Sequence, residues 1–158
     1  MTGQFFCTTI AGLALSIAGF ASIVTALRPG GRWTRTVLWR LRGIVGEALT
    51  ITVVAVLPLP VYYLVGGDEL LTIRVLSGIL ALKFVIAIWR SFAERAEWGR
   101  RYVIRAVLLL GIQPAAQLAN VSLASLALLM FGLLAWLTFP IQLRFAIIKD
   151  FQPPMDGD

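Results

Sequence analysis

The feature that most constrains this chain is a series of apolar runs, each about as long as a membrane-spanning helix. The first extends from Phe5 to Leu27 without a charged residue, and others cover 43–65, 70–89 and most of 106–148. A helix needs about 20 apolar residues to cross the hydrocarbon core of a bilayer. The pattern predicts an all-α fold, a polytopic transmembrane helical bundle.

The composition agrees with a bilayer as the solvent of this fold. Of the 158 residues, 59% are hydrophobic and 14% are charged, whereas a soluble domain has about 45–50% apolar and about 25% charged residues. A soluble chain of this length could not bury so much apolar surface. The first run lacks a preceding basic residue and is longer than the core of a signal peptide, so we interpret it as a retained span.

The distribution of charge predicts five spans. The spans are expected at about 5–27, 43–65, 70–89, 103–119 and 123–147, with a tight turn at 119–122. With the N-terminus outside and the C-terminus inside, all but two of the 14 lysine and arginine residues lie in segments on the inner side. This is the positive-inside pattern. The remaining residues, 149–158, are expected to form a disordered cytoplasmic tail.

A four-span arrangement remains an alternative. It would make 106–148 one long helix kinked at Pro114, or a re-entrant helix followed by a span. We prefer five spans, because four would place the basic C-terminal end outside.

The net charge of +6 is therefore explained by topology and does not indicate nucleic-acid binding. The inner-surface basic residues are Arg28, Arg32, Arg35, Arg40, Arg42, Arg95, Arg100 and Arg101. They are expected to attract anionic lipids at the cytoplasmic face. The expected partners are thus the lipid bilayer and either a second copy of the chain or another membrane protein, with no nucleic acid.

Glu47 in the second predicted span and Lys83 in the third are charged residues of opposite sign. A charge at mid-bilayer costs about 2.5–3.5 kcal/mol on insertion scales. The tight turn at 66–69 should make these spans antiparallel neighbours, with both residues at a similar depth. We predict an intramembrane ion pair; the alternative is that each side chain reaches separately to the inner headgroups. Arg74 also falls in the third span, near its outer end, where its side chain is expected to reach outward or to contact Asp68 or Glu69.

Three amides, Gln113, Gln117 and Asn120, are spaced by four and three residues, which places them on one face of the fourth span. Amides in hydrocarbon need partners, and such interhelical bonds contribute about 0.6–2 kcal/mol. We expect this polar face to pack internally; the alternatives are a seam between subunits or the lining of a water-filled path. Asn120 falls in the predicted turn, where it would instead cap the helix.

Helix packing and a kink are also predicted. The small residues of the first span are Ala14, Ala18 and Ser22 on one face and Gly12, Ser16 and Gly19 on an adjoining face. Small residues let backbones approach closely, so this helix should pack centrally or at an oligomer contact. In the second span, Pro58 and Pro60 predict a kink near the outer end, with a hinge as the alternative.

The sequence offers little for catalysis. It has no histidine and one cysteine, Cys7, so neither a disulfide within the chain nor a histidine-based metal site can form. No catalytic motif is present, and we expect no enzyme activity, no cofactor and no metal.

The opening pattern TIAGLALSIAGFASIVTALR, with Trp33 and then WRLRGIV, resembles small multi-span bacterial inner-membrane proteins. The resemblance covers the first third of the chain and implies location in the inner (plasma) membrane and no particular activity. We expect a non-catalytic protein that acts through helix association, as a homo-oligomer that could form an ion-conducting pore. The alternatives are an accessory subunit of a larger membrane complex and a regulatory protein acting through its basic cytoplasmic loops.

Overall fold

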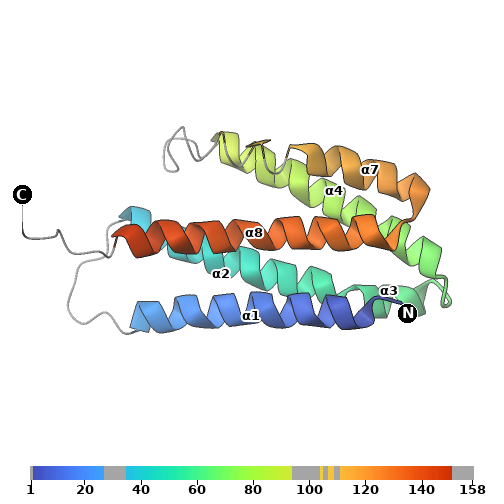
Figure 1. Ribbon diagram of the computed structural model, residues 1–158, viewed down its shortest axis with the longest axis horizontal. Helices are drawn as coiled ribbons and strands as arrows, with labels where there is room; N and C mark the ends of the chain where they lie inside the picture. Colours follow the sequence, from blue (N-terminus) through green and yellow to red (C-terminus); the bar gives the residue numbers. More distant parts are fainter. Residues whose placement is uncertain (1, 27–34, 94–103, 105–106, 109–110, 151–158) are drawn as a thin grey trace, which may run out of the picture.

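The computed structural model describes residues 2–26, 35–93, 104, 107–108 and 111–150. The helices are α1 (Gln4–Ala26), α2 (Arg35–Val56), α3 (Pro58–Leu64), α4 (Glu69–Ala93), α7 (Ile112–Leu123) and α8 (Leu126–Asp150). Within these ranges every regular element is a helix (Figure 1). The all-α prediction is therefore confirmed for the part of the chain that the structure describes.

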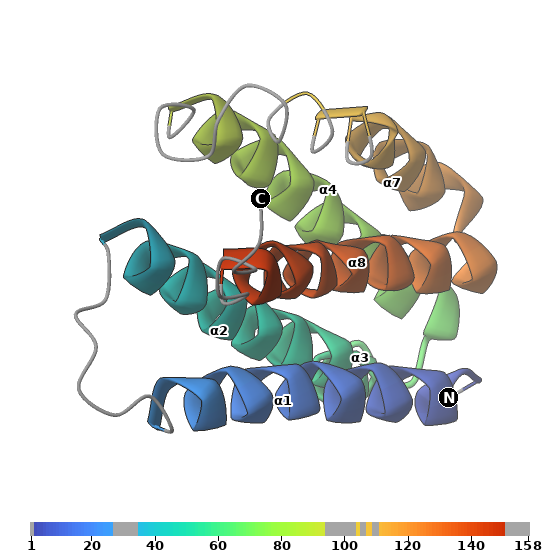
Figure 2. The same cartoon turned by 60° about the vertical axis from the view of Figure 1, so that its left-hand side comes forward.

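Two helix pairs and one central helix make up the bundle. α1 packs along α2, and α7 packs along α4. α8 lies between these pairs and contacts all four helices (Figures 1 and 2). The last helix of the chain is thus the one that connects the two halves of the bundle.

The α1–α2 pair forms much of the core through a regular stripe of buried residues. On α2 the stripe is Val37, Leu41, Ile44, Ala48, Ile51 and Ala55, at alternating intervals of four and three. Such spacing keeps one face toward a neighbouring helix and favours knobs-into-holes packing. Ala14 of α1 and Ala48 of α2 are both completely buried, so the two helix backbones approach closely.

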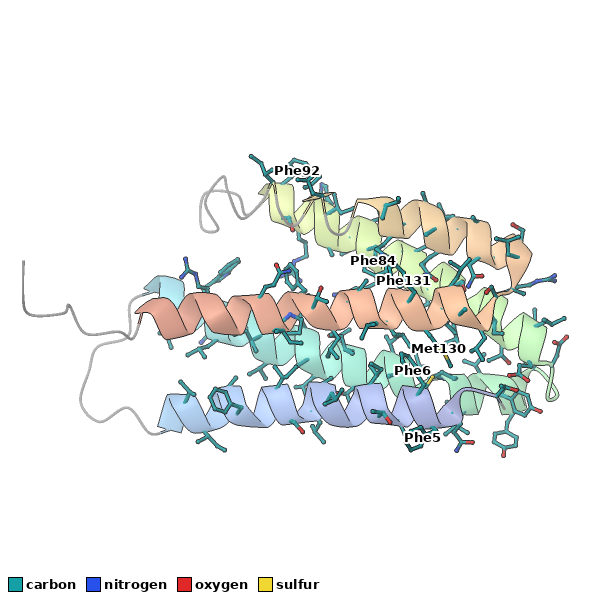
Figure 3. The ribbon with its side chains drawn as sticks, viewed as in Figure 1. Phe5, Phe6, Phe84, Phe92, Met130 and Phe131 are labelled. Atoms are coloured by element: carbon teal, nitrogen blue, oxygen red, sulfur yellow. The ribbon has the colours of Figure 1, made fainter. Side chains whose placement is uncertain are left out.

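Within the described residues, three helical segments are long and apolar enough to cross a membrane: Gln4–Val24, Val37–Leu64 and Glu69–Ala93. Their outer faces carry large apolar side chains, as Phe5 (85% exposed) illustrates, whereas Phe84 (1% exposed) points into the bundle (Figure 3). α7 has 12 residues. The start of the predicted fourth span, 103–110, lies mostly outside the described residues.

The two ends of the bundle differ in charge. At one end, which we call the turn end, lie the start of α1, the α3–α4 turn and the α7–α8 turn (Figure 1). Asp68 and Glu69 are located there, and Gly66 (φ 71°) and Gly67 (φ 86°) adopt backbone angles that favour glycine. At the other end, the arginine end, α2 begins and α4 ends, with Arg42 and Arg90 close by.

The connection between the predicted second and third spans is partly as expected. α3 packs against α4 beside the turn, and α2 is antiparallel to α4. Farther from the turn, however, α2 and α4 diverge and α8 lies between them (Figure 2). The expectation that these two spans are direct neighbours along their length is therefore corrected: a third helix, whose position the turn could not reveal, separates them.

Several helix boundaries differ from the predicted ones. α2 begins at Arg35 rather than near 43, because Val37 and Leu41 extend its buried stripe. α7 continues through the predicted turn at 119–122 and ends at Leu123, and α8 extends through Asp150, into the start of the predicted tail. Residues 151–158 of that tail lie outside the described residues.

The predicted proline kink coincides with an interruption between helices. α2 ends at Val56, and Pro58 is the first residue of α3, where its missing N–H is not needed. The backbone N–H of Leu57 still donates to Val53 (3.0 Å) and that of Val61 to Leu57 (3.1 Å), so the helical path continues. A further proline, Pro140, lies buried inside α8 and was not part of the prediction.

Candidate functional site

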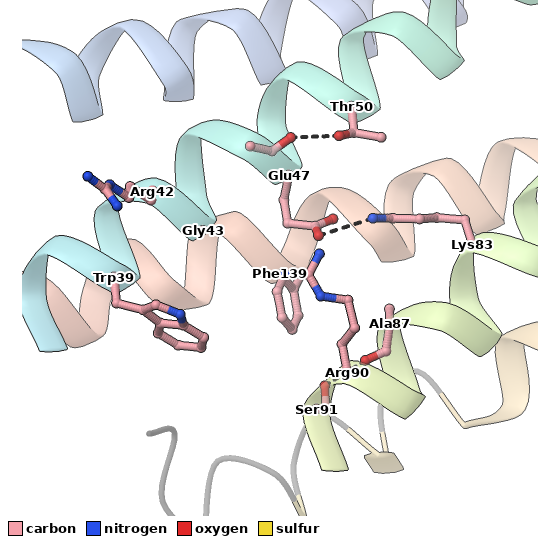
Figure 4. Close-up of a pocket in the computed structure, with 11 residues that line it drawn as sticks. Trp39, Arg42, Gly43, Glu47, Thr50, Lys83, Ala87, Arg90, Ser91 and Phe139 are labelled. Atoms are coloured by element: carbon pink, nitrogen blue, oxygen red, sulfur yellow. Dashed lines mark hydrogen bonds and ion pairs between the residues drawn. The ribbon is translucent and has the colours of Figure 1, made fainter. Parts of the chain in front are cut away.

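The two intramembrane charges predicted from the sequence lie in contact. The Nζ of Lys83 donates to the Oε1 of Glu47 at 3.1 Å, across the space between α4 and α2 (Figure 4). The side chains are only 19% and 17% exposed, respectively. Partial burial strengthens such a pair and also makes each charge costly without the other.

Trp136 of α8 completes this group. Its indole Nε1–H donates to the Oε2 of Glu47 at 2.9 Å, and the Nζ of Lys83 lies 5.0 Å from the centroid of the Trp136 ring. A cation this close to an indole face is attracted by the ring quadrupole. Both carboxylate oxygens of Glu47 are thus engaged, and three helices meet at one carboxylate. We call Glu47, Lys83 and Trp136 the charged triad.

Glu47 and Lys83 of the charged triad border a cavity of about 350 Å³, which we call the α2–α4 cavity. It is lined by Trp39, Arg42, Gly43, Gly46, Glu47, Thr50, Lys83, Ala87, Arg90, Ser91 and Phe139. Figure 4 shows Arg90 extending from α4 toward the carboxylate of Glu47. The cavity therefore has charged walls on two helices and lies on the arginine side of the triad.

The side chains of this site can bind a ligand and stabilise charge. Glu47 accepts two hydrogen bonds from Lys83 and Trp136 and is held in place by them. Among the residues that the structure describes, no group of histidine, cysteine, aspartate and glutamate side chains could hold a metal ion. A charge-lined cavity of this kind suits a polar or charged ligand.

The three amides of the polar face are all buried in α7. Asn120 donates to the Oγ of Ser77 in α4 (2.9 Å) and to the carbonyl of Ser125 (3.0 Å), and its Oδ1 accepts the backbone N–H of Ser125 (2.8 Å). These bonds hold the α7–α8 turn, in which Ala124 adopts a left-handed conformation (φ 51°). Asn120 thus connects α7 both to α4 and to the start of α8.

Gln117 connects α7 to α8 through a close contact with Gly132. Its Nε2 donates to the carbonyl of Leu128 at 2.8 Å, and a Cβ at position 132 would collide with this amide and approach the Cδ2 of Leu80 to 2.6 Å. Glycine at 132 therefore makes room for the glutamine. The Oε1 atoms of Gln113 and Gln117 have no hydrogen-bond partner among the described residues.

The small residues of α1 are divided between two environments. Ala14 and Ala18 are buried in the core, whereas Gly12, Ser16, Gly19 and Ser22 lie on the exposed side. A Cβ built on Gly12 or Gly19 would meet no atom within 4 Å. The face that was predicted to contain Ala14, Ala18 and Ser22 is thus buried only at the two alanines, because Ser22 lies near the end of α1 and is exposed. The adjoining face points outward.

The predicted basic residues are only partly visible. Arg40 and Arg42 lie on α2, and Arg35 begins that helix. Arg28, Arg32, Arg95, Arg100 and Arg101 lie outside the described residues. The arginine end accordingly contains those basic residues of the prediction that can be placed.

Sequence reasoning did not identify Trp136, Ser77 or Gly132. For Trp136 a signal existed, because a buried indole N–H needs an acceptor and Glu47 was the carboxylate expected inside the spans. Ser77 and Gly132 gave no such signal, since small residues are common throughout membrane helices.

Comparison of the chain with protein-family models, with curated proteins and with solved structures gives no match.

Proposed function

We propose that this chain is a non-catalytic five-span protein of the bacterial inner membrane that acts through association of its helices, primarily with further copies of itself. The N-terminus and the turn end would face outward, and the arginine end would face the cytoplasm. The location of Arg42 and Arg90 at one end and of Asp68 and Glu69 at the other supports this orientation, because basic residues favour the cytoplasmic side.

Five spans are supported by the arrangement of the helices. Three long apolar segments and α8 extend between the two ends of the bundle. α7 begins within the bundle and reaches the turn end, so α7 together with residues before it would form the fourth span.

The proposed association is supported mainly by the small residues on the outward face of α1. Gly12, Ser16 and Gly19 recur at intervals of four and three, are exposed, and at both glycines leave open space where a side chain would be. In lipid, helices associate mainly by close packing, and such a face lets a second backbone approach. The adjoining face, with Ala14 and Ala18, already packs in this way inside the protomer.

An ion path along the amide face has less support, because Asn120 and Gln117 make their hydrogen bonds within the protomer. A pore would instead require a path formed between subunits. Ion flux through liposomes that contain the purified oligomer would test it directly.

The mass of the particle extracted in mild detergent, measured by native mass spectrometry, tests the proposed association. We expect a defined homo-oligomer that the double substitution Gly12→Leu and Gly19→Leu converts to monomers. Gly78→Leu is the matched control, since position 78 on α4 also has open space around its Cβ. A wild-type monomer would contradict the proposal, and a single copy bound to other chains would identify an accessory subunit instead.

A further inference from the structure

The α2–α4 cavity has the size of a site for a small polar group. Its volume of about 350 Å³ is at the lower end of the range of roughly 300–1,000 Å³ that is common for ligand sites. The wall includes Gly43, Gly46 and Ala87, and a Cβ on Gly46 would meet no atom within 4 Å. Small residues on both helices thus create the space.

The charge of the cavity favours an anion. Its wall contains three cationic side chains, Arg42, Lys83 and Arg90, and one anionic side chain, Glu47. Glu47 is already bound by Lys83 and Trp136. Arg90 has a contact of its own in the protein, and a guanidinium with five N–H donors can bind an anion in addition. Among the described residues that line this space, positive charge therefore exceeds negative charge.

In the proposed orientation, the two arginines lie toward the headgroup level of the bilayer. Along their helices, Arg42 is about 7.5 Å and Arg90 about 10.5 Å closer to the arginine end than the Glu47–Lys83 pair, at 1.5 Å per residue. Trp39, which also lines the cavity, is a residue type enriched at the membrane–water interface. The cavity thus extends from the headgroup level toward the buried pair.

Exposed apolar side chains lie on both helices that wall the cavity. On α2, Val53 (61% exposed) lies about one helical turn beyond Thr50, and on α4, Ile86 (41% exposed) directly precedes Ala87. Such side chains suit the acyl chains of a lipid whose headgroup enters the cavity. A small water-soluble anion would gain nothing from them.

The hydroxyl groups in the wall indicate what the headgroup should carry. Thr50 donates its proton to the carbonyl of Gly46 (2.7 Å), and Ser91 donates to that of Ala87 (2.8 Å). Each hydroxyl oxygen is left as an acceptor. A headgroup that bears hydroxyl donors matches these acceptors.

We propose that the α2–α4 cavity binds the headgroup of one anionic phospholipid per protomer, with its phosphate at Arg90. Arg42 lines the α2 wall, and its exposed side chain can turn from the position in Figure 4 toward the same phosphate. Headgroup hydroxyls point toward Thr50 and Ser91, and the acyl chains follow the exposed apolar side chains of α2 and α4. This site requires a protein embedded in a membrane, but it does not depend on self-association.

Native mass spectrometry of the purified protein with added lipid tests this proposal. The probes are phosphatidylglycerol and phosphatidylcholine with identical acyl chains, added in equal amounts. We expect one phosphatidylglycerol to be retained per protomer, in the monomer and in any oligomer, at collision energies that remove phosphatidylcholine. Equal retention of the two lipids would overturn the proposal.

Substitutions at the site and away from it identify the position of the lipid. The double substitution Arg42→Gln and Arg90→Gln should weaken retention by about tenfold or more, as expected for the loss of charge-assisted contacts worth about 1.4 kcal/mol. Gly46→Leu, which fills the cavity without removing a charge, should do the same. The controls Arg74→Gln and Gly78→Leu should retain the lipid as the wild type does.

Two further results would contradict the proposal. If Arg74→Gln weakens retention as much as the double arginine variant, general charge attraction explains the binding. If inorganic phosphate at millimolar concentration displaces the lipid, the cavity selects a soluble phosphate and not a phospholipid. Folding of each variant is verified by its helical circular dichroism and thermal unfolding in the same detergent.

Discussion

Trp136 and Glu47 are 89 positions apart in the chain, and the indole N–H of Trp136 donates to the Oε2 of Glu47 at 2.9 Å. Because Lys83 bonds the other carboxylate oxygen, α2, α4 and α8 are joined at one side chain. Hydrogen bonds in a medium of low dielectric constant are strong when all partners are present. The loss of Lys83 or Trp136 leaves one carboxylate oxygen of Glu47 without its donor, and the loss of Glu47 leaves both donors without their acceptor, so substitutions in the charged triad should be coupled.

Glu47→Gln and Lys83→Met should each destabilise the protein, because each leaves a partly buried charge without its partner. We expect each to lower the free energy of unfolding by about 1–3 kcal/mol, and the double variant to lose at least about 1 kcal/mol less than the sum. Unfolding in mixed micelles measures these values. Strictly additive losses would show that the two residues do not interact.

Trp136→Phe should destabilise the protein by about 1–3 kcal/mol, since it keeps an aromatic ring but removes the donor to Glu47. Trp89→Phe is the matched control: Trp89 is 71% exposed, and its replacement should change the unfolding free energy by less than about 0.5 kcal/mol. Similar effects at the two positions would mean that ring size and not the hydrogen bond determines the loss.

Gly132→Ala should destabilise the α7–α8 contact by about 1–3 kcal/mol, because the added methyl group overlaps the amide of Gln117 and crowds Leu80. Gly78→Ala, at a position with open space, should not destabilise, since alanine favours helix. Thermal unfolding in detergent compares the two.

Combining Gly132→Ala with Gln117→Ala should restore part of the stability lost in Gly132→Ala alone, because the shortened side chain removes one of the two crowded contacts. If the double variant is less stable than Gly132→Ala by the full cost of Gln117→Ala, the contact between these residues is not the cause.

Asn120→Ala should loosen the α7–α8 turn and cost about 1–3 kcal/mol, because it removes three hydrogen bonds and leaves buried groups without partners. Hydrogen exchange at the backbone N–H of Ser125 should become faster. Ser122→Ala is the control, because Ser122 is exposed and its hydroxyl donates only within α7, to Ala119. Unchanged exchange in Asn120→Ala would argue that other contacts hold the turn.

The Glu47–Lys83 contact shows how far the sequence can predict this structure. Charges are so costly in apolar helices that few positions remain to be paired, and chain topology limits their depth. The predicted contact between Glu47 and Lys83 is present although α2 and α4 are not direct neighbours along their length. Long side chains bridge a separation that helix packing alone would not predict.

Other features were not predictable for a physical reason. α8 is apolar on nearly all sides, so its sequence gives no periodic signal of the face that turns toward Glu47 or toward Gln117. The turn lies at Ala124, later in the chain than the predicted turn at 119–122. Asn120 and Ser122 suggested a break in the helix, but their side chains form hydrogen bonds with Ser125 and Ala119, respectively, while both residues remain helical. Likewise, spacing alone could not say which small-residue face of α1 is buried.

The position of α8 between the two helix pairs has a consequence for biosynthesis. Ribosomes synthesise chains from the N-terminus, so Glu47 and Lys83 are made before Trp136. Until α8 is made, the nascent chain holds this pair of opposite charges without the indole donor, and its α1–α2 and α4 segments lack the helix that joins them. The two halves of the bundle can therefore come together only after the last described helix has been synthesised.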